Sequence, residues 1–284
     1  MPSAVLRAEA LGAHLPPLVV EAERVASTVM QGVHGRRRAG MGDSFWQFRP
    51  YLAGDAAARV DWRQSAKAER LYLRETEWEA AQSVVLWRDG GPRMQWRSHL
   101  AEVTKKERAS LLLLALAALL LRGGERVRLL PGPPRSFQGR GALPALAEAL
   151  ALAPEASPSA ADALPRHARI VMFSDFLGPL EETRAIAAQL AARPLSGRLL
   201  QIMDPAEESL PYAGRRRFEG LLGELPAILP RVEAVRDLYA ARLAAQRAGL
   251  ADMAGGLGWS FSTHRTDARP ETALLALWQG LAPA

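Results

Sequence analysis

The sequence predicts an α/β fold: a doubly wound, mostly parallel sheet preceded by a helix and a small β-rich unit. After residue 81, runs of strand length alternate with helical patterns. Several runs, such as VVLW at 84–87, are apolar throughout, which is typical of parallel strands covered on both faces. Some of them end in an acid before turn-forming residues, as in Asp89-Gly90-Gly91. Together these patterns favour an open parallel sheet with polar side chains at one edge.

The first 80 residues follow a different pattern. Helical spacing over 5–35 is interrupted near Pro16 and Pro17. Short extended pieces then follow, with strands predicted at 44–51 and 70–79 and a short helix at 62–67. We therefore predict an N-terminal region at 1–80 and an α/β domain at 81–284.

The elements of the α/β domain follow in order. The predicted strands are 83–89, 125–130, 168–175, 197–204 and 258–266, and the predicted helices lie near 99–121, 142–151, 179–192, 230–252 and 270–281. The apolar run 111–121 is about half of the roughly 20 residues that a membrane span needs, so it predicts a buried helix. The charged segment 215–219 predicts a solvated hairpin.

Composition limits the function. The chain has no cysteine, which excludes disulfides, thiolate catalysis and cysteine zinc sites. No basic stretch leads into an apolar leader, so we expect a cytoplasmic protein. The net charge is +6, with GRRR clusters at 35–38 and 214–217, the first followed by SFWQFRPY. Interleaved arginine and aromatic residues leave a nucleic-acid-binding protein as an alternative, although nucleic acid is the less favoured partner.

Enzyme motifs are missing from the sequence. It has no G-x-S-x-G elbow, and Gly91 stands where an aspartyl-phosphate phosphatase needs a second acid. GRGALP at 139–144 holds a lone G-x-G, a weak dinucleotide signal. The histidines are scattered, and His264 at a strand end is expected to be packed. We therefore expect no catalytic activity and no cofactor.

Three acids end predicted strands: Asp89, Asp175 and Asp204. Ligands of open parallel sheets bind beyond the carboxyl ends of the strands. We expect the strands that end at Asp89 and Asp175 to be adjacent at the centre of the sheet. Two carboxylates that meet there repel each other unless a cation or an arginine lies between them.

The segment 40–67 resembles the signature of the family known as domain of unknown function fifty-eight, in which R-x-Y-x-x-G-D leads to [IV]-D-W-x-x-S-A. The matching residues here are Arg49, Tyr51, Gly54, Asp55, Val60, Asp61, Trp62, Ser65 and Ala66. RRRFEGL at 215–221 and HRTD at 264–267 are similar to the branch without membrane helices. Ala56 and Ala58 depart from the family, which often has an acid and an arginine there, and Arg59 lies beside them.

The resemblance implies a von Willebrand factor A-like fold, whose first strand often ends in the D-x-S-x-S of a metal-ion-dependent adhesion site. Asp89 keeps the first place, Gly91 and Arg93 stand in the serine places, and Asp175 is the candidate distal acid. No threonine lies between 121 and 165, so the usual threonine ligand is missing too. We hypothesise a degenerate site without metal in which Arg93 bridges both aspartates. The alternatives are that Arg93 faces solvent while the acids cap helices, or that weak metal binding survives.

The resemblance also implies a partner. Members of this family look like partners of MoxR-type AAA+ ATPases that help to assemble or activate client proteins, so we expect a non-catalytic adaptor. A divalent-metal-dependent ligand-binding module is the alternative. The charged and aromatic residues of the signature either form an internal ion-pair lattice or a surface that recognises a partner. This set comprises Asp55, Arg59, Asp61, Trp62 and Arg63.

Overall fold

The computed structural model describes residues 17–34, 45–51, 60, 62–67, 70–76, 82–132, 134–159 and 164–281. The chain divides into two compact units. The larger unit comprises Met1–Gly32 and Gln82–Ala284, and the smaller comprises Val33–Ala81.

The larger unit is built on a mostly parallel sheet of order β10-β7-β6-β3-β4-β5. Its strands are β3 (Ser83–Arg88), β4 (Arg126–Leu130), β5 (Ser136–Phe137), β6 (Arg169–Ser174), β7 (Ser196–Met203) and β10 (Ser260–Arg265). All pairings are parallel except that of β5 with β4. Strands β3 and β6 are adjacent at the centre, so the predicted pairing of the strands before Asp89 and Asp175 is confirmed.

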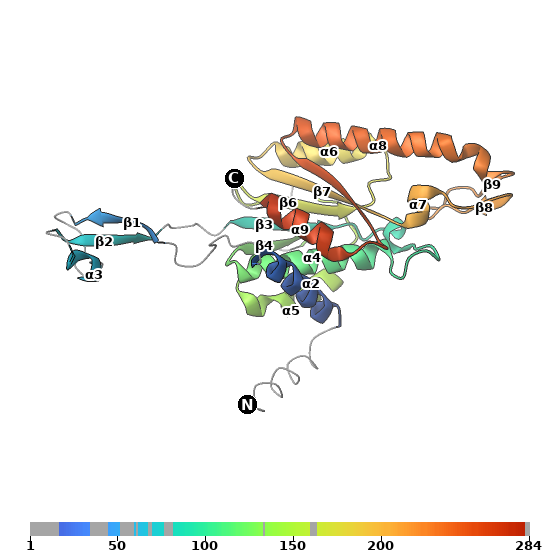
Figure 1. Ribbon diagram of the computed structural model, residues 1–284. Helices are drawn as coiled ribbons and strands as arrows, with labels where there is room; N and C mark the ends of the chain where they lie inside the picture. Colours follow the sequence, from blue (N-terminus) through green and yellow to red (C-terminus); the bar gives the residue numbers. More distant parts are fainter. Residues whose placement is uncertain are drawn as a thin grey trace, which may run out of the picture. The chain divides into compact units, whose positions relative to one another are not determined.

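Helices cover both faces of this sheet (Figure 1). Helix α4 (Lys105–Arg122) packs on one face, where it contacts α5 (Leu143–Ala151) and α9 (Pro270–Leu281). Helices α6 (Leu180–Ala191) and α8 (Arg236–Gly256) pack against each other on the opposite face. The mixed α/β fold with a mostly parallel sheet was therefore predicted correctly.

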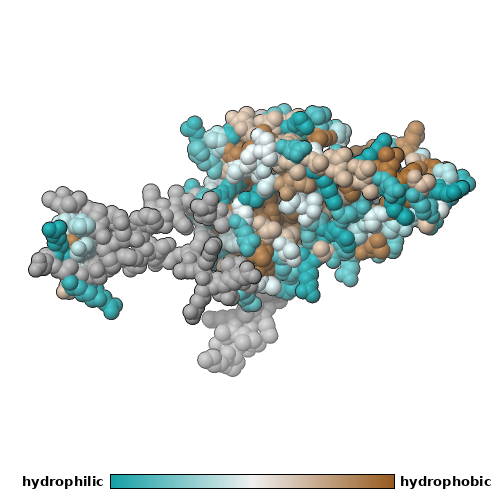
Figure 2. All heavy atoms as spheres, turned by 45° about the horizontal axis from the view of Figure 1, so that its top comes forward, coloured by the Kyte–Doolittle hydropathy of each residue, from teal (hydrophilic) through white to brown (hydrophobic). Residues whose placement is uncertain are grey.

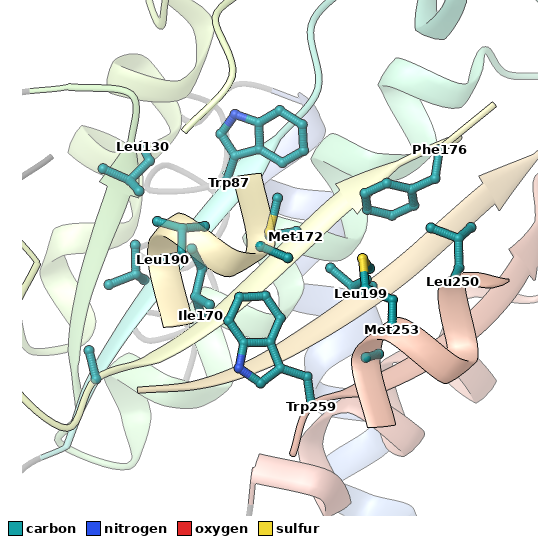
Figure 3. Close-up of a cluster of buried hydrophobic side chains, with 14 residues drawn as sticks. Trp87, Leu130, Ile170, Met172, Phe176, Leu190, Leu199, Leu250, Met253 and Trp259 are labelled. Atoms are coloured by element: carbon teal, nitrogen blue, oxygen red, sulfur yellow. The ribbon is translucent and has the colours of Figure 1, made fainter. Parts of the chain in front are cut away.

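The face under α6 and α8 carries a buried apolar cluster, shown in Figure 3. Strand side chains of alternate positions, such as Ile170 and Met172, point into it, as the twofold period of a strand requires. Trp259 closes one end and packs against Gly197: a β-carbon at Gly197 would lie 2.1 Å from the indole ring. A glycine is needed here because the backbone and the ring approach so closely.

Helix α4 is buried on every side over residues 111–121, with no side chain there more than 5% exposed. The sheet covers one side of the helix and other helices cover the rest, so no polar stripe is needed. The predicted buried helix is confirmed. No described helix is long and apolar enough to cross a membrane.

The N-terminal helix corrects the predicted division of the chain. Helix α2 (Pro17–His34) was grouped with the β-rich region, but its residues up to Gly32 belong to the α/β unit. Its apolar residues Val19, Val25 and Val29 are buried, and the Arg122 guanidinium of α4 donates a 3.1 Å hydrogen bond to Ser27 Oγ. The apolar face of α2 is what places it there.

The smaller unit is described in part. Strands β1 (Phe45–Pro50) and β2 (Tyr72–Thr76) pair in antiparallel fashion, and α3 (Trp62–Ser65) lies between them in sequence. Ser65 Oγ accepts a 2.8 Å hydrogen bond from the Tyr72 amide, which ties α3 to β2. The two predicted strands and the short helix are thus present.

Other elements are short. The 3-10 turns η2 (Pro92–Gln95), η3 (Arg140–Ala142) and η4 (Val232–Val235) precede α4, α5 and α8. Helix α7 (Pro205–Ser209) follows β7, and β8 (Arg216–Phe218) pairs with β9 (Ala227–Leu229) in a hairpin. Arg217 and Glu219 form a 3.1 Å ion pair on that hairpin, both more than half exposed, so the predicted solvated hairpin is confirmed.

Candidate functional site

The carboxyl ends of β3, β6 and β7 bring three acids to one edge of the sheet. Asp89 follows β3, Asp175 follows β6, and Asp204 follows β7. After β3 the chain adds β4 and β5 on one side of that strand. It then crosses to the other side of β3, where it adds β6, β7 and β10, so the strand order reverses between β3 and β6. This is the place at which open α/β sheets bind ligands. We call these three acids, with Lys105 and Glu207, the carboxylate edge.

The carboxylate of Asp89 is bonded to neutral donors. Its Oδ1 accepts a 2.8 Å hydrogen bond from the Gly91 amide, and its Oδ2 accepts one of 2.7 Å from Ser174 Oγ. The Asp89 amide donates to the Phe173 carbonyl at 2.8 Å, which fixes the turn to the neighbouring strand. Both carboxylate oxygens of Asp89 therefore have hydrogen-bond partners within the chain.

A buried ammonium group lies beside Asp175. Lys105 Nζ donates to Asp175 Oδ2 at 2.9 Å and to Glu207 Oε1 at 2.5 Å. The side chains of Lys105 and Asp175 are fully buried, and that of Glu207 is 17% exposed. An isolated charge could not be buried in this way, whereas a paired and hydrogen-bonded one can. Lys105 thus links β6 to α7 through two carboxylates.

Lys105 occupies an unusual position for its charge. It is the first residue of α4, and Thr104 caps that helix through a capping box with Glu107. The start of a helix favours negative rather than positive side chains, because the backbone dipole is positive there. A lysine at this position is therefore explained by the carboxylates around it, because the start of a helix does not favour a positive charge.

Glu207 connects the carboxylate edge to the short helix α7. Asp204 caps α7 by accepting from the Ala206 amide at 2.8 Å, while Glu207 Oε2 accepts from the Asp204 amide at 3.1 Å. Burial raises the pKa of the Glu207 carboxyl above its usual value, although Lys105 acts in the opposite direction. The second oxygen of Asp204 accepts a 2.8 Å hydrogen bond from the Ser98 amide.

A second layer of polar contacts fixes Asp175. Gln201 Nε2 donates to the Asp175 carbonyl at 2.8 Å, and Arg247 Nε donates to Gln201 Oε1 at 2.9 Å. The next residue, Phe176, has a φ of +47°, a left-handed conformation that non-glycine residues rarely adopt. Backbone strain of this kind persists where surrounding contacts enforce it, and it is frequent at functional sites.

Arg93 does not form the predicted bridge. Among the described residues, no ion pair joins Arg93 to Asp89 or to Asp175, and Lys105 supplies the cation beside Asp175. The Arg93 guanidinium lies instead over Gly178, where a β-carbon would be 3.0 Å from one of its nitrogens. Arg93 is part of the 3-10 turn at 92–95, which starts directly after Gly91. The expected cation is present, but a different residue carries it.

Within the described residues, no group of three or more acidic or histidine side chains is arranged to hold a metal ion. Asp89 and Asp175 lie on adjacent strands, as predicted, and the Gly91 amide contacts Asp89. His264 is packed as expected: it is 6% exposed, and burial lowers its pKa to about 4.

The signature residues are described only in part. Arg49 lies in β1, and the Tyr51 amide donates to the Leu71 carbonyl at 2.8 Å. Trp62 is 66% exposed and Arg63 is also exposed, so both are available to a partner. Gly54, Asp55, Arg59 and Asp61 lie outside the described residues, so the ion-pair lattice and the recognition surface both stay predictions.

Sequence reasoning missed Lys105 and Glu207. One signal for Lys105 was present: the chain has only three lysines against an excess of arginine, and two of them are adjacent, shortly before the apolar run of α4. Glu207 carried the capping-box spacing after Asp204, since D-x-x-E marks a helix start. Neither signal says that the two side chains meet, because 102 residues separate them.

Comparison with known proteins gives the following matches. The model of the family "Protein of unknown function DUF58" matches residues 47–249. The uncharacterized proteins Rv1480 of Mycobacterium tuberculosis (strain ATCC 25618 / H37Rv) and Mb1516 of Mycobacterium bovis (strain ATCC BAA-935 / AF2122/97) are each 26% identical over 276 residues, covering 90% of this chain and 85% of theirs.

Two solved structures were also matched. An aerotolerance-related membrane protein from Bacteroides fragilis NCTC 9343, with multiple mutations to serines, is 12% identical with a TM-score of 0.40, covering 70% of this chain and 98% of its own. The conserved hypothetical protein BatB from Bacteroides thetaiotaomicron is 16% identical with a TM-score of 0.32, covering 70% and 96%.

Proposed function

Starting from the fact that this chain belongs to the DUF58 family of proteins of unknown function, we propose that it is a non-catalytic protein-interaction adaptor that needs no bound metal. Its partner in this proposal is a MoxR-type AAA+ ATPase in the cytoplasm, with which it assembles or activates a client protein. The sheet is proposed to be of von Willebrand factor A type, with the carboxylate edge as a degenerate metal-ion-dependent adhesion site.

One observation carries the proposal: the buried Lys105 ammonium, 2.9 Å from Asp175 Oδ2. A metal-dependent adhesion site places a divalent cation beside the acid at this position of the sheet. An ammonium already bonded to Asp175 and Glu207 neutralises the same charge and would repel a dication. Asp89 meanwhile has both oxygens bonded to Gly91 and Ser174. The geometry therefore favours a module that binds partners without a bridging metal.

Among the described residues, Ser174 and His264 are not paired as a nucleophile and a base, which supports the non-catalytic part of the proposal. Ser174 is 4% exposed, and its hydroxyl donates to a carboxylate that is held by backbone contacts. His264, which could serve as a base, lies on β10, separated from β6 by β7. A hydrolytic site needs a nucleophile and a base within hydrogen-bond reach of each other.

Binding to the ATPase tests the proposal directly. The chain would be immobilised, and the MoxR-type ATPase of the same organism would be passed over it with ATP or with ADP. We expect saturable binding that is unchanged when Asp89 is replaced by Asn. An ATPase that binds no better than an unrelated AAA+ protein would refute the adaptor proposal. Micromolar Mg²⁺ binding that Asp89→Ala abolishes would support a metal-dependent module instead.

A further inference from the structure

A groove opens beside the carboxylate edge. It has a volume of about 660 Å³ and lies between the β8–β9 hairpin, α7 and the start of α8. Its lining combines aromatic and aliphatic side chains with two arginines and two glutamates. The lining residues are Trp96, Ala206, Glu207, Leu210, Tyr212, Arg216, Arg217, Phe218, Glu219, Leu221 and Tyr239. We call this feature the hairpin groove.

The wall of the hairpin groove is fixed by contacts within the chain. The rings of Tyr212 and Phe218 meet edge to face, with centroids 5.9 Å apart and planes at 75°. Arg236 donates to the Leu210 carbonyl at 3.2 Å and to the Tyr212 carbonyl at 3.0 Å, which holds the segment after α7 against α8. Grooves that exist before binding cost less ordering entropy when they are filled.

The hairpin also exposes aliphatic side chains to solvent. Leu225 is 91% exposed, Leu222 54% and Ile228 53%, and Leu238 at the start of α8 is 57% exposed. Figure 2 shows hydrophobic residues gathered at the end of the molecule that carries this hairpin. An apolar surface that is contiguous with a groove and bordered by charges is typical of a protein-binding site.

Charge at the groove is uneven. The acids of the hairpin are already engaged: Glu219 with Arg217, Glu224 with the Leu222 amide at 2.8 Å, and Glu233 with the Gly214 amide at 2.8 Å. Arg216 is exposed, and its guanidinium forms no ion pair or hydrogen bond with the described residues. Arg216 is therefore a lining residue of the groove whose cation has no ion-pair partner among the described residues.

We infer that the hairpin groove binds a short segment of a protein partner that carries aliphatic or aromatic side chains alternating with Asp or Glu. The apolar side chains lie against Phe218 and Tyr212, and a carboxylate pairs with Arg216. The inference rests on the proposed function, since it names the docking surface of the adaptor. A nucleic acid fits less well, because residues 214–239 carry five arginines and four acids and so form no basic track.

The groove and the carboxylate edge share one residue. Glu207 lines the groove and also binds Lys105, and the Tyr239 hydroxyl donates to the Glu207 carbonyl. A segment that fills the groove would therefore contact Glu207, the partner of Lys105. Glu207 therefore belongs both to the lining of the hairpin groove and to the buried ion pair.

Labelled synthetic peptides test the inference by fluorescence anisotropy. Three peptides would be compared: one with Leu and Phe alternating with Glu, one with Lys in place of Glu, and one with Ser in place of Leu and Phe. We expect the acidic apolar peptide to bind at least about tenfold more tightly than the other two, because both the anchors and the charge contribute. Equal affinity for all three would overturn the inference.

Variants of the chain locate the binding. Phe218→Ala and Arg216→Glu should each weaken the acidic peptide by about tenfold, the second mainly through slower association. Leu225→Ser, at a side chain that is 91% exposed, tests the apolar surface without touching the core. Arg166→Glu, at an exposed position just before β6 and so at the opposite edge of the sheet, is the matched control. Losses equal to that of the control would refute a site in the hairpin groove.

The same variants separate this inference from the proposed function. If the ATPase binds the wild type and all groove variants equally, the groove is not the docking surface, although the adaptor proposal stands. If the ATPase does not bind the wild type but the acidic peptide binds in the groove, the proposed partner is wrong and the docking surface stands. Loss of both interactions in Phe218→Ala and Arg216→Glu, but not in Arg166→Glu, supports both.

Discussion

Replacing Lys105 by Met removes the buried charge and keeps most of the apolar stem. Lys105 bonds to Asp175 at 2.9 Å and to Glu207 at 2.5 Å, and the Lys105 and Asp175 side chains are fully buried. Loss of one partner leaves Asp175 buried without a counter-charge. Removing one member of a buried ion pair typically costs about 3–5 kcal/mol, and we expect Lys105→Met to lower the free energy of unfolding by that amount.

Urea denaturation followed by circular dichroism measures this loss, and the adjacent lysine provides the control. Lys106 pairs with Glu155 at 2.7 Å, but both side chains are partly exposed, so Lys106→Met should have little effect. Adding Asp175→Asn to Lys105→Met should recover part of the stability, because the stranded carboxylate is removed. A loss in Lys105→Met no larger than that in Lys106→Met would refute the reasoning.

Three further predictions concern stability. Burial lowers the pKa of His264 from 6.5 to about 4, so its contribution to stability is complete above pH 6.5 and is lost as the pH falls towards 4. In His264→Leu, the loss of unfolding free energy on acidification should therefore be smaller than in the wild type by about 3 kcal/mol. A pH profile of stability that is the same in both proteins would contradict this. Burial raises the pKa of the Glu207 carboxyl, so the stability of the wild type relative to Glu207→Gln should fall as the pH rises through that pKa. A difference in urea midpoints between the two proteins that does not change with pH would count against this. Gly197→Ala should lower the melting temperature, because the added β-carbon would lie 2.1 Å from the Trp259 ring. Gly255→Ala in α8 has free space around the added β-carbon and should raise the melting temperature slightly. Equal shifts of the two melting temperatures in calorimetry would refute the close packing of Trp259 on Gly197.

The sheet and its helices were predictable because their signals are local. The strand at 83–89 and the helix at 270–281 were placed within a residue of β3 and α9, since each has a continuous apolar or periodic pattern and clear ends. Two short elements were not found: β5 has two residues and α7 has five, too few to show a period. Residues 99–104 read as helix, but Thr104 caps α4 there, so that the helix begins at Lys105.

The candidate site was predictable only to the level of strand ends. The meeting of the strands before Asp89 and Asp175 followed from topology, and the need for a positive charge beside them followed from electrostatics. Which residue supplies that charge depends on side-chain direction, and the sequence favoured Arg93 because it is near Asp89 in the chain. Lys105 reaches Asp175 across 70 residues of sequence, through packing of α4 on the sheet, which no local pattern encodes.

The most direct test of the built-in cation is a crystal of this protein soaked in Mn²⁺ and measured for anomalous diffraction. We predict no manganese peak between Asp89 and Asp175, with Lys105 Nζ still bonded to Asp175 as it is at 2.9 Å here. A manganese ion with octahedral ligands that include both aspartates, and Lys105 displaced from Asp175, would contradict the account.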